Sequence, residues 1–369
     1  MQTDVFVAGG GPAGLAAAIA ARQKGLRVVV ADSARPPIDK VCGEGLMPDG
    51  VAALSKLGVK VGCHQAVRFR GIRFVKGEAS VVAAFPNGCG LGIRRTTLHQ
   101  VLVERAAEAG VSLLWGTTLL GISPDRVRLD GGTIRCRWII AADGQNSQVR
   151  KWAGLDRIRH EQIRFGFRRH YRITPWTDFV EVHWGHKCQV VVTPVGPEEV
   201  CFTLISSSAR LRFENALPLF PGLAKRLNGA PATTTERGAI SVLRSIRVVS
   251  RGRVALVGDA SGSVDAITGE GLCLAFQQAV FLAEALAHND LSPYQAAHRR
   301  LARLPNWMSR LMLLMDKHEG LQRSAMRALV KEPHLFSRLL ATHVGAPTPV
   351  AIGISGALRL CWQLLTGWT

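Results

Sequence analysis

The chain has little of what would indicate a secreted, metal-binding or nucleic-acid-binding protein. Its eight cysteines form no CxxC pair and no cysteine/histidine cluster with zinc spacing, so neither a disulfide framework nor a metal site is expected. No leader-like segment precedes the first apolar run, and a cytoplasmic location is expected. Only two tyrosines are present, with no helix-turn-helix, zinc finger or aromatic RNA platform, so nucleic-acid binding is not expected.

Acidic residues are scarce relative to basic ones. The 369 residues include 46 Lys and Arg against 27 Asp and Glu, which gives a formal net charge of +19. A basic surface attracts anions, and it is compatible with an anionic membrane surface, an acidic carrier protein or a reduced nicotinamide cofactor. Charge alone selects none of these partners.

Long apolar runs are also missing. The apolar stretch at residues 345–358 is too short to cross a bilayer and contains two prolines. The residues after it fit an interfacial anchor, a dimer contact or a packed cap of the fold, and we favour the cap. These residues are Leu358, Leu360, Cys361, Trp362, Leu364, Leu365 and Trp368, beside Arg359.

A glycine-rich turn follows the first apolar segment. Residues 4–8 are predicted as a buried strand and residues 15–24 as a helix, with Gly9-Gly10-Gly11-Pro12-Ala13-Gly14 between them. In such a unit the first glycine permits a tight turn, Gly11 lets a pyrophosphate approach the backbone, and the last glycine lets helix and strand pack closely. This turn predicts a dinucleotide site.

An acidic residue supports the same prediction. A second strand is predicted over residues 26–31 and ends at Asp32. A carboxylate at this place binds a ribose 2′-hydroxyl and favours an adenosine without a 2′-phosphate.

A second glycine motif lies far downstream. A predicted strand at residues 254–257 leads to Gly258-Asp259, where the carboxylate can accept hydrogen bonds from ribityl hydroxyls. Thr268-Gly-Glu-Gly271 then opens a helix predicted over residues 271–288. Bare N–H groups at the positive end of this helix suit the negative charge of a reduced flavin. The two motifs together favour FAD.

Three further segments carry a resemblance to a known superfamily. They are Lys40-Val-Cys-Gly-Glu-Gly-Leu-Met-Pro48, Gly92-Ile-Arg-Arg-Thr-Thr-Leu98 and Asp143-Gly-Gln-Asn-Ser-Gln-Val-Arg150. With the two glycine motifs, the chain resembles the FAD-dependent monooxygenases and geranylgeranyl reductase-like flavoproteins, which share the para-hydroxybenzoate hydroxylase type of fold. The resemblance implies FAD as the cofactor and NAD(P)H as its reductant. No second dinucleotide-binding turn is evident, so NAD(P)H would bind transiently, or a separate flavin or electron-transfer reductase would supply the electrons.

The resemblance also implies particular site residues. It places Cys42 and Glu44 near the flavin or its entrance, although a buried small hydrophobe fits Cys42 nearly as well. It also places Arg95 near the pyrophosphate and Leu119 over the adenine. The complete cofactor set is Gly9, Gly11, Pro12, Ala13, Gly14, Asp32, Lys40, Cys42, Gly43, Arg95, Leu119, Asp143, Gly144, Gly258, Asp259, Gly269, Gly271 and Leu272.

Substrate-facing residues are assigned by position alone. They are His183, Trp184 and Thr193, and Glu44 joins these candidates through the resemblance. A hydrogen-bonded structural histidine is the favoured interpretation of His183, ahead of one that polarises a phenol. No catalytic side chain is assigned.

The order of the motifs predicts an α/β fold with a Rossmann-like FAD-binding domain of the glutathione-reductase type. This domain is expected to be discontinuous and to comprise residues 1–60, 90–155 and 250–290. Apolar alternation predicts a mostly antiparallel substrate domain from residues 61–89 and 156–249. Residues 291–369 are predicted as helices, with breaks at Pro305, Pro333, Pro347 and Pro349.

Several chemistries fit this cofactor, and we favour monooxygenation. Reduced FAD and O2 would then oxygenate an apolar, phenolic or polyketide-like molecule. Prenyl double-bond reduction is the second possibility, because Gly269-Glu-Gly-Leu272 resembles the prenyl reductases. However, Gln189-Val-Val-Val-Thr-Pro194 replaces their aromatic YxWxFP segment, and Ala266 stands where they usually have proline. The aromatic hydroxylases, in turn, have a histidine where Gly262 lies.

Halogenation and a non-catalytic role are less favoured. Halogenation would require a lysine that Arg68-Phe-Arg-Gly-Ile-Arg-Phe74 does not contain, and no WxWxIP motif is present. A non-catalytic FAD-binding protein is the least favoured interpretation, because the loop expected to face the flavin ring is intact.

Overall fold

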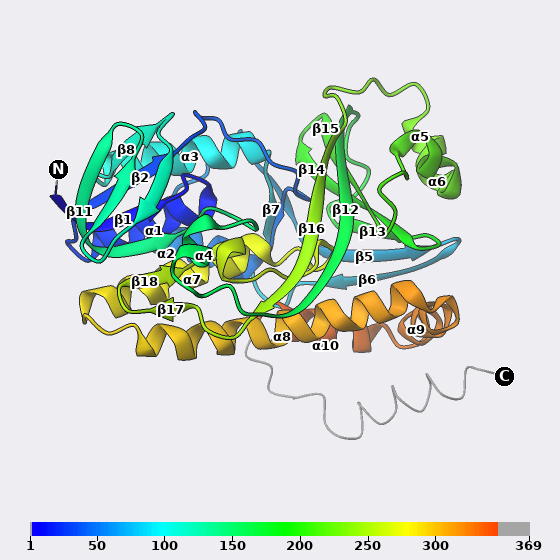
Figure 1. Cartoon of the computed structure of the whole chain (residues 1–369). Coiled ribbons are helices and arrows are strands. Elements are labelled where there is room, and N and C mark those ends of the chain that lie inside the picture. The colour runs from blue at the N-terminus through cyan, green and yellow to red at the C-terminus, as the bar shows by residue number, and fades with distance from the viewer. Residues whose placement is uncertain (1, 346–369) are drawn as a thin grey trace.

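The computed structural model describes residues 2–345, without the side chains of residues 159 and 160. Two β-sheets lie end to end, and a layer of helices runs along one side of both (Figure 1). The α/β class and the C-terminal helices agree with the sequence-based prediction.

The first sheet has the order β17-β18-β11-β1-β2-β8 and is parallel from β18 to β8. Its central strands are almost fully buried, which is typical of parallel strands covered on both faces. A short antiparallel extension from β9 (Leu119–Ile122) and β10 (Arg126–Leu129) pairs with β11. The strands of the main path are β1 (Gln2–Ala8), β2 (Val28–Asp32), β8 (Ser112–Trp115), β11 (Gly132–Ala141), β17 (Ser250–Arg251) and β18 (Val254–Leu256).

Helices of this first unit follow its strands in the expected places. They are α1 (Pro12–Gln23), α2 (Pro48–Lys56), α3 (Arg95–Glu108), α4 (Gln148–Trp152) and α7 (Gly271–Ala287). The predicted strand-turn-helix at the N-terminus and the long helix after Thr268 are both confirmed. A small sheet of β3 (Gly45–Leu46), β7 (Gly90–Gly92) and β4 (Val67–Phe69) joins this unit to the second sheet.

The second sheet has the order β16-β12-β15-β14-β13-β5-β6 and is antiparallel except for the pair β13 and β5. Its strands lie within the residues that apolar alternation assigns to the substrate domain, 61–89 and 156–249, together with two small helices that were not predicted, α5 (Phe213–Ala216) and α6 (Pro221–Leu227). The strands are β5 (Gly71–Lys76), β6 (Ala79–Ala84), β12 (Ile158–Arg172), β13 (Val180–Trp184), β14 (Cys188–Gly196), β15 (Glu199–Ser206) and β16 (Arg237–Ile246).

Up to residue 345, three helices form the C-terminal layer: α8 (Ser292–Lys317), α9 (Glu319–Lys331) and α10 (Pro333–His343). The predicted break at Pro305 is wrong, because this proline is buried inside α8 and tertiary packing outweighs its local cost. Pro333 does begin a new helix. Pro347, Pro349 and the apolar segments around residues 345–368 lie outside the described residues. Within residues 2–345 we find no helix with the length and apolarity needed to cross a membrane.

Candidate FAD and substrate site

A cavity of about 1010 Å³ lies where the two sheets meet the C-terminal helices. Its walls combine the turns after β1, β2, β11 and β18 with one face of the second sheet and with α8, α9 and α10. The carboxyl ends of parallel strands are where α/β folds bind ligands. Every residue of the predicted cofactor set lines this cavity except Gly14.

The glycines show how the backbone makes room for a ligand. A Cβ atom placed at Gly11, Gly43, Gly144 or Gly271 would meet nothing within 4 Å, so each of these glycines borders open space. Gly14 differs, since its Cβ would lie 1.9 Å from the carbonyl oxygen of Gly9. Gly14 therefore serves helix packing, as the glycine motif predicts. The open glycines line a cradle that fits FAD.

Polar groups at the adenosine end also fit a dinucleotide. The carboxylate of Asp32 accepts hydrogen bonds from the N–H of Gly10 (2.7 Å) and of Ala34 (2.8 Å), which hold it at the cavity wall. Arg95, at the start of α3, is buried, and its Nε has no hydrogen-bond partner among the described residues. A buried, unpartnered guanidinium N–H suits an anionic pyrophosphate.

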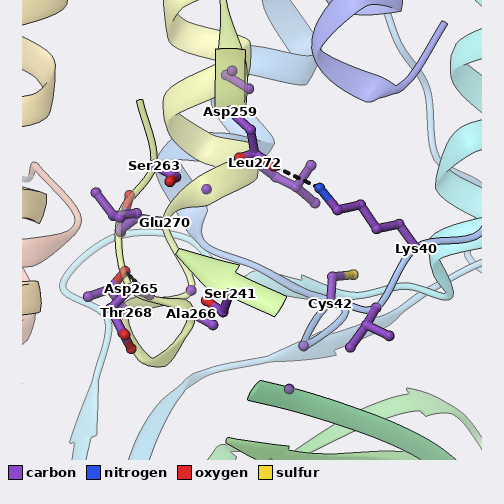
Figure 2. A pocket seen from close by; sticks show the side chains of 18 of the residues that line it. Lys40, Cys42, Ser241, Asp259, Ser263, Asp265, Ala266, Thr268, Glu270 and Leu272 are labelled. Carbon is purple, nitrogen blue, oxygen red and sulfur yellow. Dashed lines mark hydrogen bonds and ion pairs between the residues drawn. The ribbon is translucent and has the colours of Figure 1, made fainter. Parts of the chain in front are cut away.

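Asp259 and Lys40 face each other across the cavity (Figure 2). Lys40 Nζ lies 2.8 Å from Asp259 Oδ2, and both side chains are partly exposed. This ion pair connects the loop of Lys40 to the turn of Asp259, and both segments border the cavity. With FAD bound, Asp259 would accept hydrogen bonds from the ribityl hydroxyls, and Lys40 would remain beside the negative charge of Asp259.

Arg150 has a structural role that the sequence motif does not reveal. Its side chain is 2% exposed and donates hydrogen bonds to the carbonyl oxygens of Ala260 (3.1 Å) and Gln145 (3.0 Å). Its Nε also lies 2.7 Å from Asp156 Oδ1. Arg150 thus connects two turns that border the cavity, and the last residue of the DGxxSxxR pattern supports the site without contacting its ligand space.

Glu44 lines the cavity, but its carboxylate is fully engaged by the protein. It receives hydrogen bonds from the backbone N–H of Arg95 (2.9 Å) and from Arg168 Nη1 (3.0 Å), and it lies 2.6 Å from His170 Nε2. The backbone of Glu44 has a φ of 56°, which these contacts stabilise. Glu44 therefore holds the Cys42–Gly45 loop in shape, and a direct role with the substrate is not favoured.

Two further residues, Thr193 and Cys42, lie in or against the Cys42–Gly45 loop. Thr193 Oγ1 donates to the carbonyl oxygen of Gly43 (2.7 Å), so this residue both lines the cavity and holds the loop. Burial raises the pKa of the Cys42 thiol, with a smaller opposing effect of Arg95, and Cys42 therefore remains a neutral thiol at neutral pH.

His183 and Trp184 do not line the cavity, which corrects the assignment by position. Along β13, Val180 and Val182 face the cavity, so alternation turns His183 to the other face, where its Nε2 lies 2.9 Å from Glu181 Oε2. Trp184 is buried beyond the cavity against Phe74, with ring centroids 5.9 Å apart. The favoured interpretation of His183, a hydrogen-bonded structural histidine, agrees with these contacts.

A buried acidic group at the cavity wall was not predicted. Glu270, directly before α7, is 2% exposed, and its Oε1 lies 3.1 Å from Nε2 of His343 at the end of α10. The same Nε2 lies 3.1 Å from the carbonyl oxygen of Thr268, so its single proton cannot serve both acceptors fully. Side-chain atoms of Asp49, Glu270 and Cys273 lie within 4.8 Å of one another.

The surroundings of Glu270 favour its neutral form. Burial, and secondarily the negative charge of Asp49, raise the pKa of Glu270 well above its ordinary value. Burial lowers the pKa of His343, against a smaller effect of its hydrogen bond to Thr268. A neutral carboxyl group directly before α7 leaves the positive end of the helix unopposed, which suits a reduced flavin.

We expect Glu270→Gln to stabilise the protein relative to wild type, increasingly so as the pH rises. Above the ordinary glutamate pKa of 4.5, Glu270 ionises in the unfolded chain but stays protonated in the folded one, so wild-type stability falls as the pH approaches the raised pKa. Glutamine does not titrate. Urea unfolding at several pH values measures the difference, which should vanish below pH 4.5.

Glu104→Gln, at an exposed position of α3, is the control, and its difference in stability from wild type should not change with pH. A difference between Glu270→Gln and wild type that stays constant with pH would contradict the protonated state of Glu270.

The remainder of the cavity is strongly apolar. Val180, Val182 and Val191 form its wall on the second sheet. The opposite wall comes from the C-terminal helices, with Met308, Leu311, Met312, Met315, Leu321, Ala325, Leu329, Phe336, Leu339 and Leu340. Methionine-rich walls adapt to irregular apolar ligands. The cavity thus has a polar end at the glycine turns and an apolar arm beneath α8, α9 and α10.

Comparison with known proteins supports the assignment of this site. Menaquinone reductase of Mycolicibacterium smegmatis is 28% identical over 326 residues, which cover 80% of this chain and 79% of that protein. The 6-methylpretetramide 4-monooxygenase of Streptomyces rimosus is 28% identical over 395 residues, which cover 92% of this chain and 91% of that protein. A crystal structure of a flavoprotein/dehydrogenase from Cytophaga hutchinsonii has the same fold, with a TM-score of 0.85 at 16% identity over the whole of both chains.

The predicted superfamily is confirmed by these similarities and by a family match to most of the chain. The FAD binding domain family matches residues 2–291, a range that contains all the glycine turns of the cavity. The chain therefore belongs to the FAD binding domain family, within the superfamily of FAD-dependent monooxygenases and geranylgeranyl reductase-like flavoproteins, and is an FAD-dependent oxidoreductase.

Proposed function

We propose that the protein is a monooxygenase that acts on an apolar substrate with a phenolic or polyketide-like head. The observation that carries this proposal is the division of the cavity into a polar end at the flavin-binding turns and an apolar arm beneath the C-terminal helices. When bound, reduced FAD supplies the electrons with which one atom of O2 enters the substrate and the other leaves as water. NAD(P)H, or a separate reductase, would supply those electrons.

The chain's own contribution would be to bind, orient and exclude water. The apolar arm would hold the hydrophobic part of the substrate, and its walls would exclude water from the reacting centre. The amino end of α7, with neutral Glu270 before it, would favour the reduced cofactor. Among the described residues of α8, α9 and α10 that line the cavity, only His343 is titratable, and burial lowers its pKa and so favours its neutral form.

Reduction of a carbon–carbon double bond is the second candidate. Glu270 favours it, because a buried acid kept protonated at the cavity wall can donate the proton that must follow a hydride. The similarity to menaquinone reductase supports the same candidate. Against it, the segment that replaces the prenyl reductases' aromatic motif begins at Gln189, whose side chain is hydrogen-bonded to Arg164 and Asp316.

Isotope labelling separates the two candidates. The FAD-loaded protein is given NADPH or NADH, and 18O2 or no oxygen, with long-chain alkylphenols in one series and prenylated quinones in the other. We expect an oxygenated phenol that contains one 18O atom and does not form without O2. A product that gains two hydrogens under anaerobic conditions, and contains no new oxygen, would overturn monooxygenation in favour of reduction.

A further inference from the structure

One face of α8 carries an exposed stripe that the cofactor chemistry does not use. Arg303, Trp307, Arg310, Leu314 and Lys317 recur at intervals of three or four residues, and all are exposed. Such spacing places them on one side of the helix. Trp307 is 53% exposed and Leu314 is 46% exposed, and the two lie two helical turns apart on the same face as the basic residues.

Within α8, the stripe has no exposed negative charge to balance it. The only acidic residue of α8 is Asp316, whose side chain is 7% exposed and is paired with Arg164. Within residues 2–345 no ion pair is found for Arg303, Arg310 or Lys317. Arg299 and Arg300, one turn earlier, are exposed and basic as well. The stripe therefore combines unpaired cations with an aromatic and an aliphatic side chain.

The other side of α8 faces the cavity. Met308, Leu311, Met312 and Met315 line the apolar arm, so this single helix separates the arm from the surface that carries the stripe. In Figure 1, α8 runs along the outer side of the molecule beneath both sheets. A substrate held in the apolar arm would therefore lie one helix away from whatever binds the stripe.

We propose that this face of α8 docks on an anionic phospholipid bilayer, with Arg303, Arg310 and Lys317 at the headgroups and Trp307 and Leu314 inserted at the interface. Basic residues at a helix surface attract anionic lipids, and tryptophan and leucine bury in the headgroup region. The surface is distinct from the cavity, so the docking does not depend on which reaction the flavin performs.

Vesicle sedimentation with the full-length, FAD-loaded protein tests the proposal. We expect binding to vesicles that contain phosphatidylglycerol, weaker binding at high salt, and little binding to pure phosphatidylcholine. Arg303→Glu/Arg310→Glu should weaken binding at least about thirtyfold, because the loss of two basic residues near a charged membrane accounts for that factor and the two new carboxylates are repelled by the anionic lipid. The matched control is Arg128→Glu/Arg137→Glu, which changes the net charge equally at exposed positions of β10 and β11 and should retain most of the binding.

Fluorescence quenching by brominated phosphatidylglycerol tests the insertion itself. We expect quenching in the wild type that decreases in Trp307→Phe, with FAD content and thermal unfolding unchanged in all variants. The proposal is overturned if the wild type binds no vesicles, or if the control pair weakens binding as much as the stripe pair. Quenching that is undiminished in Trp307→Phe would also overturn it and would assign the lipid contact to another segment, such as residues 346–369.

Discussion

Gly11→Val should leave the fold intact and weaken FAD binding about tenfold to hundredfold. Gly11 has a φ of −69°, which any residue adopts, and a Cβ there meets no protein atom within 4 Å. The added side chain would instead occupy the space that the dinucleotide needs, and overpacking of this kind costs about 1–3 kcal/mol. Titration of the apoprotein with FAD, followed by flavin fluorescence, measures the affinity, and urea unfolding of the apoprotein measures the fold.

Gly14→Ala is the contrasting variant in the same turn. Its Cβ would lie 1.9 Å from the carbonyl oxygen of Gly9, so the backbone of α1 must move away from the turn. We expect Gly14→Ala to lower the stability of the apoprotein and also to weaken FAD binding, whereas Gly11→Val should weaken FAD binding only. If both variants lowered the stability of the apoprotein equally, the assignment of Gly11 to the ligand cradle would be contradicted.

The cofactor half of the cavity was predictable because each part of it is local in sequence. A glycine turn between a strand and a helix, or an aspartate directly after a strand, requires only neighbouring residues to take its shape. For this reason Gly9 to Gly14, Asp32 and Gly258-Asp259 all reach the turns around the cavity as predicted, with Gly14 packed just behind its wall. The predicted ends of α7 agree with the structure to within one residue for the same reason.

The substrate half was less predictable because its contacts join distant segments. Glu270 meets His343, which lies 73 positions later on a helix that the sequence indicates only as helical. The resemblance placed Glu44 near the flavin, and Glu44 does line the cavity, yet its partners His170 and Arg168 come from β12, and no local pattern indicates that they would occupy its carboxylate. His183 was misplaced because a strand prediction without a register does not say which face a residue takes.

Arg164→Ala should have the largest effect on stability, a loss of about 3–5 kcal/mol in the free energy of unfolding. Arg164 is 2% exposed, with Nη1 3.1 Å from Asp265 Oδ1 and Nη2 3.5 Å from Asp316 Oδ2. The side chains of Asp265 and Asp316 are only 1% and 7% exposed, so removal of the guanidinium leaves two carboxylates without their cation and almost without water. Breaking a buried ion pair by removing one partner is costly for this reason.

The position of this cluster means that the same variant should also disturb the site. Asp265 accepts a hydrogen bond from the N–H of Ile267 (3.0 Å) and begins the turn that leads to Gly269 and the amino end of α7. Without Arg164 this turn loses its anchor to β12, and we expect weaker FAD binding in addition to the loss of stability.

Urea unfolding and FAD titration of three variants on β12 test this argument. Arg164→Lys keeps the charge but not the planar fork, so its loss of stability should be intermediate. Arg172→Ala removes an exposed arginine of the same strand and should change the free energy of unfolding by less than about 0.5 kcal/mol. A loss for Arg164→Ala that is no larger than that of Arg172→Ala would show that Arg164 contributes little to the stability of the fold. Equal losses for Arg164→Ala and Arg164→Lys would instead assign the effect to the geometry of the guanidinium, because the positive charge of lysine would then restore none of the lost stability.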